Sequence, residues 1–339
     1  MAARRKAGGS RAKTGGARAK TSRGATRPRA AGAGAGAGQR SATARQRAGA
    51  ARGVTRLPVA KTYKLYIDGK FPRSESGRYF ELHVNGGALI ANVCRSSRKD
   101  FRDALVAARA AFDKWSSSSA YLRGQILYRI AEMLEGRSEQ FITELTLQGR
   151  TRREAEAEVS KSIDRLVYYA GWADKYQQVF SAVNPVSTSH FNFSVLEPTG
   201  VVAVIAPEAS GLLGLVSNIA PAIAGGNTCV VLASESQPLS AVSLAEVLQS
   251  SDVPAGVVNV LTGHKSELIE QFASHMDVNA VIYCEGDAKA TRQIGELAAD
   301  NIKRVILRAR IDWSADEAQS PYFISDTQET KTTWHPIGS

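Results

Sequence analysis

A cysteine and a glutamate stand side by side where a short apolar run ends, and these are residue types that nucleophilic chemistry uses. Cys284 closes the run 280–284, and Glu285 follows it. A thiolate nucleophile needs a base within hydrogen-bonding reach or a nearby positive charge. A neighbouring carboxylate acts in the opposite sense, because it raises the pKa of the thiol. We therefore interpret Cys284 as a small buried residue rather than a catalytic one.

Two other polar residues follow apolar runs of the same kind. Glu235 comes shortly after the run 228–232, and His264 follows Gly263 at the end of the run 257–261. Glu235 can bind a ligand or cap the next helix, and His264 can touch a ligand or lie in a solvated loop. The sequence holds no Ser-His-Asp set and no P-loop, and its three cysteines lack metal-ligand spacing.

Five apolar runs would have to position these residues. The runs are 201–206, 228–232, 257–261, 280–284 and 304–307. They lack polar alternation, which is typical of parallel strands covered by helices on both faces. Each gap between them is long enough for a crossover helix. The sequence predicts an α/β fold, a Rossmann-like doubly wound parallel sheet of about five strands, whose ligands would bind at the carboxyl ends of the strands.

The residues before this sheet predict a helical segment. Apolar residues recur at helical spacing from Phe101 to Trp115, and Ser97 with Asp100 matches a capping box. The stretch 152–178 predicts one long charged helix. Polar and apolar residues alternate over 184–196, which is typical of a strand.

Several motifs resemble the cofactor domain of the aldehyde dehydrogenase superfamily. They are G-V-V-A-V-I-A-P from Gly200, I-A-P-A-I-A-G-G-N-T-C-V-V-L-A-S-E-S-Q-P from Ile219, and V-P-A-G-V-V-N-V-L-T-G from Val253. The stretches L-Y-I-D-G-K-F from Leu65 and A-A-R-A-A-F-D-K-W from Ala107 are similar to the family's amino-terminal part. The resemblance covers roughly residues 63 to 310, and it places an oligomerisation hairpin at about 184–197.

This resemblance implies NAD or NADP as cofactor. The residues that match its binding positions are Ile205, Ala206, Pro207, Glu235 and Gly263. Two departures oppose binding. Leu232 stands where the family has a ribose-binding Lys, and Y-C-E-G-D-A-K-A from Tyr283 replaces the family's F-T-G-S-T-x-x-G. Glu285 and Asp287 thereby face a helix N-terminus that would have to attract pyrophosphate, so we expect weak nucleotide binding.

The catalytic positions of the family are also replaced. Ala209 stands where the family has its oxyanion-holding Asn, and the general-base Glu of its L-E-L-G-G segment aligns with Leu307 and Arg308. A guanidinium cannot accept a proton. The nucleophilic Cys belongs to a domain that follows in the family, whereas this chain ends at Ser339. We therefore expect no catalytic residues in this chain.

The end of the chain predicts assembly. Residues 329–336 resemble the family's carboxy-terminal strand, which pairs between subunits, and Trp334 to Gly338 matches a W-x-P-x-G ending. The pattern is most similar to the second, nucleophile-free unit of the two-unit family-sixteen aldehyde dehydrogenases. We expect a non-catalytic subunit that binds a catalytic aldehyde dehydrogenase or itself. The alternative is an NAD(P)-dependent oxidoreductase whose nucleophile and base come from a partner chain.

The amino-terminal residues differ in composition from the rest. Residues 1–60 hold fifteen Lys or Arg and no acidic residue, so the formal net charge of +11 leaves about −4 for residues 61–339. Large apolar residues are almost absent there, which predicts disorder. Such a tail can contact polyanions, or it can be only a solubilising extension.

These observations divide the chain into a disordered basic tail (1–60), a cofactor-binding domain (61–310) and a carboxy-terminal oligomerisation segment (311–339). The sequence has no apolar region typical of a signal peptide, and polar residues interrupt the apolar stretch 209–226. We expect no transmembrane segment and a cytoplasmic location.

Overall fold

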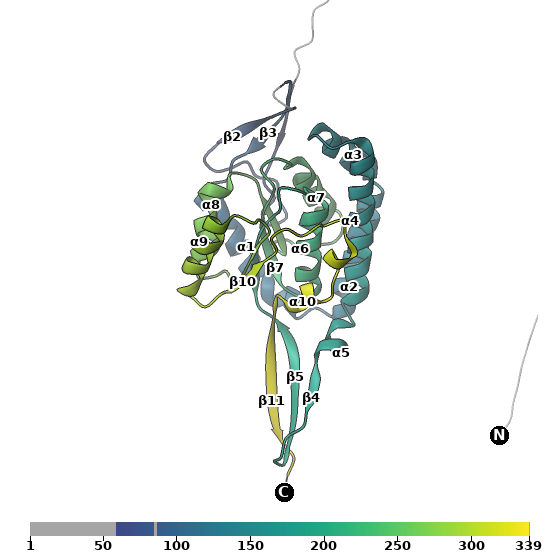
Figure 1. The fold of residues 1–339 in the computed structure, drawn as a ribbon, viewed down its shortest axis with the longest axis vertical. Helices are drawn as coiled ribbons and strands as arrows, with labels where there is room; N and C mark the ends of the chain where they lie inside the picture. The colour runs from purple at the N-terminus through teal and green to yellow at the C-terminus, as the bar shows by residue number, and fades with distance from the viewer. Residues whose placement is uncertain (1–58, 85–86, 339) are drawn as a thin grey trace, which may run out of the picture. The chain divides into compact units, whose positions relative to one another are not determined.

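The structure is a computed structural model that describes residues 59–84 and 87–338. The predicted disordered tail, apart from its last two residues, lies outside the described residues. The described part contains three sheets and the helices that cover the largest of them (Figure 1). Among the described residues, no helix combines the length and the apolar character needed to span a bilayer.

The central sheet has five parallel strands, in the order β10-β9-β6-β7-β8. Its strands are β6 (Val201–Ile205), β7 (Thr228–Leu232), β8 (Val258–Leu261), β9 (Ala280–Tyr283) and β10 (Arg304–Leu307). Every residue of the first four is buried. The chain winds outward from β6 to β8, then crosses to β9, which lies on the other side of β6. The predicted doubly wound α/β fold is confirmed, with a switch point between β6 and β9.

Helices cover both faces of this sheet (Figure 1). One face carries α2 (Ala120–Glu135), α3 (Ser138–Leu147), α4 (Arg152–Trp172), α6 (Leu213–Ala224) and α7 (Leu239–Gln249). The other face carries α1 (Arg98–Ser116), α8 (Lys265–Ser274) and α9 (Ala288–Ala299). Alternate strand residues supply the two cores: Val202 and Val204 join the first, and Val201, Ala203 and Ile205 join the second. This two-sided burial explains the unbroken apolar runs.

The capping boxes set where the amino-terminal helices begin. The Ser97 side chain accepts hydrogen bonds at the start of α1, and the Asp100 carboxylate accepts one from the Ser97 backbone N–H, as predicted. The predicted helix over 152–178 is wrong in one respect, because α4 ends at Trp172 and a separate helix, α5 (Tyr176–Phe180), follows. Hydrogen bonds between residues three apart tighten the chain at this break. The turn allows the Tyr176 ring to be buried.

A second sheet packs beside the central one. It has three short strands in the order β1-β3-β2, which are β1 (Lys61–Tyr63), β2 (Tyr79–His83) and β3 (Leu89–Cys94). Its apolar residues pack against α7 through Leu239 and Val242.

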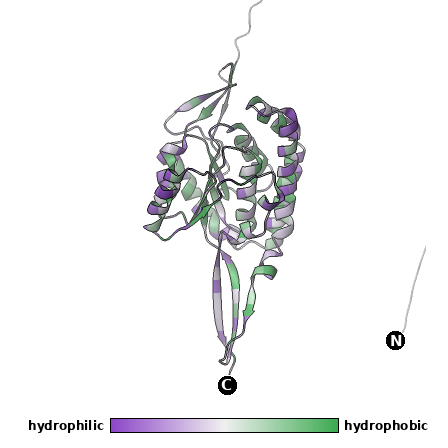
Figure 2. Cartoon of the chain, viewed as in Figure 1, coloured by the Kyte–Doolittle hydropathy of each residue, from purple (hydrophilic) through white to green (hydrophobic). Residues whose placement is uncertain are grey.

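The third sheet projects away from the helices (Figure 1). It consists of β4 (Ala182–Asn184), β5 (His190–Pro198) and β11 (Gln328–Pro336), in the order β11-β5-β4. The predicted hairpin is therefore present as β4 and β5. Strand β11 pairs with β5 of its own chain, antiparallel and along its full length. Figure 2 shows hydrophilic and hydrophobic residues mixed along this sheet, unlike the apolar strands in the middle of the molecule.

The residues between the central sheet and β11 pack on the same core as the helices. They include a short 3-10 helix (Asp316–Ala318) and α10 (Tyr322–Ser325). Trp313, Ala318 and Ile324 are buried in the core shared with α4 and α6. The segment thus covers the face of the molecule on which α4 and α6 lie.

Candidate functional site

Charged side chains gather at the carboxyl ends of the central strands, where ligands bind in folds of this class. Glu208 follows β6, Glu235 follows β7, Lys265 begins the helix after β8, and Glu285 follows β9. These four residues lie far apart in the sequence, and the parallel arrangement of the strands brings them to one edge. We call this set the strand-end cluster.

Glu208 is the centre of the strand-end cluster. Its carboxylate accepts hydrogen bonds from the backbone N–H groups of Glu235 (2.9 Å) and Ser236 (3.0 Å), and from the hydroxyls of Ser234 and Ser236 (both 2.7 Å). The Lys265 ammonium lies 2.6 Å from it. Burial alone would raise the pKa of Glu208, but the Lys265 charge and these hydrogen bonds outweigh it and lower the pKa to about 2. Glu208 is therefore ionised and saturated with donors.

Lys265 connects three of the strand ends. Besides pairing with Glu208, its ammonium donates to the Ala206 carbonyl at 2.9 Å, where β6 ends, and lies 3.4 Å from the Glu285 carboxylate. The Lys265 side chain is only 14% exposed. A charged group this deeply placed needs such partners, because desolvation of an unpaired ammonium is costly.

Glu235 caps a helix, but a different one from that expected. Its carboxylate accepts a hydrogen bond from the Lys265 backbone N–H at the start of α8, and lies 2.9 Å from the His264 ring. The sequence allows Glu235 either to bind a ligand or to cap α7, the helix after its own strand. Strand β8 lies beside β7, so the helix that follows β8 begins next to Glu235. Glu235 therefore caps the helix of the neighbouring strand. His264 is consequently bound to Glu235 rather than left in a solvated loop.

Two further crossover helices, α6 and α9, also begin at carboxylates. Glu158 of α4 accepts hydrogen bonds from the backbone N–H groups of Leu212 (3.0 Å) and Leu213 (3.2 Å), where α6 begins. Asp287 caps α9 by accepting from the backbone N–H groups of the two residues that follow Ala288. The sequence placed Glu285 with Asp287 at this helix end, but Glu285 instead accepts from the Glu208 backbone N–H. Helices α6, α8 and α9 thus begin at carboxylates of the chain itself, whereas the first N–H of α7, at Leu239, donates to the Gln148 side chain.

The structure separates the five predicted cofactor-binding residues into two groups. Ala206 and Glu235 meet around Lys265. Ile205 is buried in the core, and Pro207 packs so tightly on α6 that a Cβ added to Gly214 would lie 2.4 Å from its ring. Gly263 has a φ of +151° and passes close to the backbone of Ser96. Pro207 and Gly263 therefore shape turns of the fold, and Ile205 belongs to the core.

Cys284 and Arg308, the second of which aligns with the segment of the family's general base, are both inert side chains. Cys284 is buried, and burial raises the pKa of its thiol to about 12, with a further contribution from Glu285. Arg308 is 4% exposed and donates to Asn218 Oδ1 (2.8 Å) and Asp326 Oδ2 (2.9 Å). Its guanidinium carbon lies 3.8 Å from the centre of the Phe323 ring. Arg308 therefore joins the end of β10 to α6 and to the segment before β11.

Ala209 borders a cavity of about 510 Å³ near these positions. The cavity is lined by Arg150, Glu158, Lys161 and Trp313, among others. Its wall at Ala209 carries a methyl group and a carbonyl that accepts a hydrogen bond from Arg150. This side chain has no hydrogen-bond donor to offer to an oxyanion.

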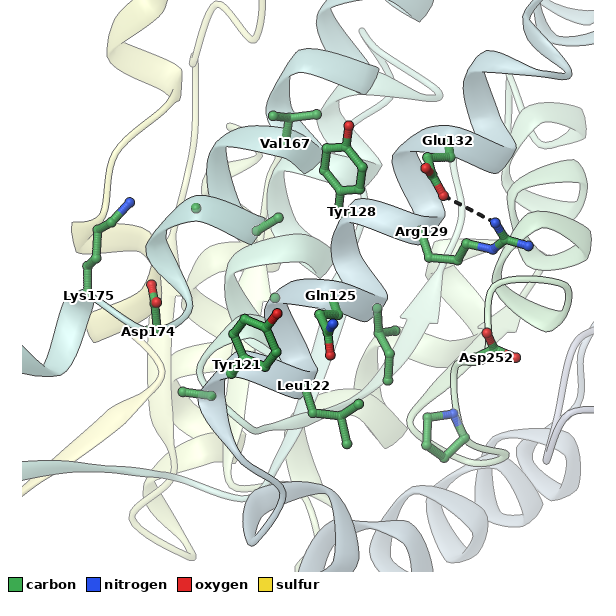
Figure 3. Close-up of a pocket in the computed structure, with 16 residues that line it drawn as sticks. Tyr121, Leu122, Gln125, Tyr128, Arg129, Glu132, Val167, Asp174, Lys175 and Asp252 are labelled. Carbon is green, nitrogen blue, oxygen red and sulfur yellow. Dashed lines mark hydrogen bonds and ion pairs between the residues drawn. The ribbon is translucent and has the colours of Figure 1, made fainter. Parts of the chain in front are cut away.

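A larger hollow lies elsewhere, between α2 and α4 (Figure 3). It is a groove of about 960 Å³ whose lining includes Tyr121, Leu122, Tyr128 and Val167. The close-up shows Arg129 paired with Glu132 on the same helix. The strand-end cluster contributes no residue to this groove. The larger cavity and the strand-end cluster therefore lie in different places. We take the strand-end cluster as the candidate site, because it lies at the edge of the sheet where ligands bind in this fold class.

Comparison with known proteins identifies the family. The model of the aldehyde dehydrogenase family matches residues 73–309. The chain belongs to the aldehyde dehydrogenase family. It is 33% identical over 247 residues to an aldehyde dehydrogenase of Aspergillus niger, covering 72% of this chain and 49% of that protein. It is 30% identical over 287 residues to mouse retinal dehydrogenase 2, covering 79% and 55% respectively.

Solved structures agree with this assignment. The NAD⁺ complex of an aldehyde dehydrogenase from Bacillus cereus superposes with a TM-score of 0.70 at 28% identity, covering 74% of this chain and 51% of that one. A structure from Burkholderia cenocepacia gives a TM-score of 0.69 at 32% identity, with 72% and 50% covered. The chain thus spans about half the length of these family members.

The arrangement of the strand-end cluster does not fit the dinucleotide that the family implies. The backbone N–H groups, hydroxyls and ammonium that would bind an anion are occupied by Glu208, Glu235 and Asp287. Leu232, at the position of the ribose-binding Lys, is fully buried in the core. Sequence reasoning did not identify Glu208 or Lys265 as members of this site. The signal available was a charged residue within four positions of the end of each of two strands, β6 and β8.

Proposed function

We propose that this chain is a non-catalytic member of the aldehyde dehydrogenase family that assembles with a catalytic aldehyde dehydrogenase or with itself. The observation that carries the first part is the environment of Arg308. A guanidinium keeps its proton, and this one is buried between Asn218, Asp326 and the Phe323 ring. It can neither remove a proton from water nor move aside without breaking these contacts.

Two further positions support the absence of catalysis. The methyl group of Ala209 offers no hydrogen bond to a developing oxyanion, and loss of one such donor typically lowers the rate by ~10²–10³. The Cys284 thiol is buried and its pKa is raised to about 12, so it is protonated near neutral pH. A protonated, enclosed thiol is a poor nucleophile.

The three-stranded sheet supports assembly. Eight of the nine residues of β11 are exposed, and large apolar side chains stand on this sheet, among them Val183, Phe191 and Trp334. Within the described residues, the edge of β11 that faces away from β5 has no strand partner. An exposed strand edge with apolar side chains favours pairing with another chain.

The alternative is an NAD(P)-dependent oxidoreductase that acts on an aldehyde or oxo group with a nucleophile and base supplied by a partner. The observation in its favour is the five-stranded parallel sheet with its helices, in a chain that superposes on an NAD⁺ complex of the family. Against it stand the carboxylates of the strand-end cluster. We propose that NAD and NADP bind weakly or not at all.

The test of catalysis is an assay of NAD(P)-dependent oxidation of propanal and benzaldehyde. We expect no turnover from the purified chain alone. Turnover that a Cys284→Ser substitution abolishes would contradict the non-catalytic proposal. Turnover that arises only with a second family chain, and exceeds that chain's own rate, would favour the alternative.

The test of assembly is light scattering on the full chain and on a truncation. The truncated chain lacks the residues from Thr330 onward. It keeps Gln328, because this side chain is buried and donates a hydrogen bond to the Gly225 carbonyl. We expect the full chain to be oligomeric, alone or with a catalytic aldehyde dehydrogenase, and the truncated chain to be monomeric. A full chain that stays monomeric in both conditions would refute the assembly proposal.

The basic tail gives a third, separate proposal. We propose that residues 1–60 contact polyanions through their positive charges. Deleting them is expected to abolish binding to a heparin column at low salt and to leave the thermal midpoint nearly unchanged. Equal retention of the full and shortened chains would refute this.

A further inference from the structure

Three of the four crossover helices of the central sheet begin beside a carboxylate of the chain itself, and a fourth carboxylate binds the turn that precedes α7. These carboxylates are Glu158 at α6, Glu208 at the turn into α7, Glu235 at α8 and Asp287 at α9. Helix N-termini and turns of this kind attract anions, because their backbone N–H groups point outward without partners. In this chain the attraction is satisfied from within.

Glu208 has the largest donor set of the four, with one hydroxyl more than Glu158, which also meets two backbone N–H groups, a hydroxyl and a cationic side chain. Two backbone N–H groups, two hydroxyls and one ammonium converge on a single carboxylate. Backbone amides, hydroxyls and a lysine are also the groups that proteins use to bind phosphate oxygens. The carboxylate therefore occupies a donor set suited to a phosphate.

We propose that Glu208 is an internal substitute for the anionic part of a nucleotide, and that its carboxylate keeps phosphate groups out of this family member. Glu208 stands three residues after β6, and the packing of Pro207 against Gly214 holds its backbone in place. A ligand attached to the protein acts at an effective concentration of at least the order of millimolar. A free phosphate compound must displace this tethered carboxylate before it can reach the same donors.

The net charge of the strand-end cluster also opposes the binding of a phosphate. Glu208, Glu235 and Glu285 contribute three negative charges and Lys265 one positive charge, which leaves the strand-end cluster negative when His264 is neutral. Removal of Glu208 changes both conditions at once. It empties the donor set, and it leaves the Lys265 ammonium with Glu285, 3.4 Å away, as its only carboxylate among the described residues.

The test is the binding of inorganic pyrophosphate, then of NAD⁺, to the full chain and to Glu208→Ala, measured by calorimetry. We expect the substitution to tighten pyrophosphate binding at least ten-fold. Glu267→Ala is the matched control, since its side chain is 32% exposed against 33% for Glu208 and pairs with Arg95 outside the cluster. The control is expected to bind as the unaltered chain does. A Glu208→Ala/Lys265→Ala chain is expected to lose the gain.

A second measurement keeps the proposal testable if the substitution lowers the stability of the fold. A ligand that binds the folded state raises the thermal midpoint, so pyrophosphate is expected to raise the midpoint of Glu208→Ala, or of Glu208→Ser, more than that of the unaltered chain. Equal affinities and equal midpoint shifts in the folded variants would overturn the internal-substitute proposal. They would leave the non-catalytic proposal intact, because that proposal fails on aldehyde turnover instead.

Discussion

The central sheet and the projecting sheet of this molecule are both built from strands, but they bury their residues to opposite extents. Every residue of β6, β7, β8 and β9 is buried, whereas eight of the nine residues of β11 are exposed. The central sheet is covered by helices on both faces, and the projecting sheet has no such cover (Figure 1). The central sheet is thus enclosed by the chain itself. The projecting sheet leaves a surface that is open to another chain.

The polar groups of the two sheets follow the same division. At the carboxyl ends of the central strands, Glu208, Glu235 and Lys265 satisfy one another and the backbone. On the projecting sheet, Phe191 and Trp334 keep 44% and 56% of their surface exposed. Exposed apolar area on a strand surface is the usual sign of an interface. The carboxyl edge of the central sheet is thus filled by side chains of the chain itself, while the projecting sheet keeps apolar side chains exposed.

The largest expected effect is on the central sheet. Leu232→Ala removes a fully buried side chain that packs among Ile205, Leu261 and their neighbours. We expect the free energy of unfolding to fall by about 2–5 kcal/mol, because a cavity remains. Urea unfolding followed by circular dichroism measures it. The matched substitution on the projecting sheet is Val183→Ala, at a side chain that is 68% exposed, and a change there above about 1 kcal/mol would erase the contrast between the two sheets.

An intermediate effect is expected from acid. The pKa of Glu208 falls from its ordinary 4.5 to about 2 in the fold, because Lys265 and the hydrogen bonds outweigh the effect of burial. A carboxyl whose folded pKa is lowered contributes stability above its unfolded pKa and loses it as the pH falls through the folded value. The thermal midpoint should therefore drop more steeply between pH 4.5 and pH 2 in the unaltered chain than in Glu208→Gln. Parallel curves would show that the strand-end cluster does not stabilise the central sheet.

The smallest expected effect on stability, and the one most specific to assembly, comes from Trp334→Ala. The side chain is more than half exposed and its ring lies 5.8 Å from that of His190, so we expect a loss below about 1 kcal/mol in the thermally unfolding monomer. The oligomer should nevertheless dissociate at lower dilution than the unaltered protein, as sedimentation velocity over a concentration series would detect. Unchanged association would place the interface away from this face of β11.

The sequence predicted the elements of the central sheet closely, because burial on both faces leaves an apolar run with little room for another interpretation. The start of α1 was equally clear, since Ser97 and Asp100 lie within one turn of each other. The break between α4 and α5 was not predicted. The break depends on the burial of Tyr176 against the rest of the molecule. The helical periodicity of the sequence does not indicate this contact.

The sequence by itself determined the family, because the motifs that carry it rest on residue identity along the chain. The predictions that Leu307 and Arg308 replace the general base, and that the last strand resembles an assembly strand, rest on residue identity in the same way. Only the tertiary structure decided how the charged residues combine. Glu208 meets the turn after β7 and the lysine that begins α8 because parallel strands in this order end side by side, although 57 positions separate Glu208 from Lys265 in the sequence. Pairing of this kind depends on strand order rather than on local spacing, so Glu235 could be placed at the sheet edge from the sequence but could not be assigned to α8.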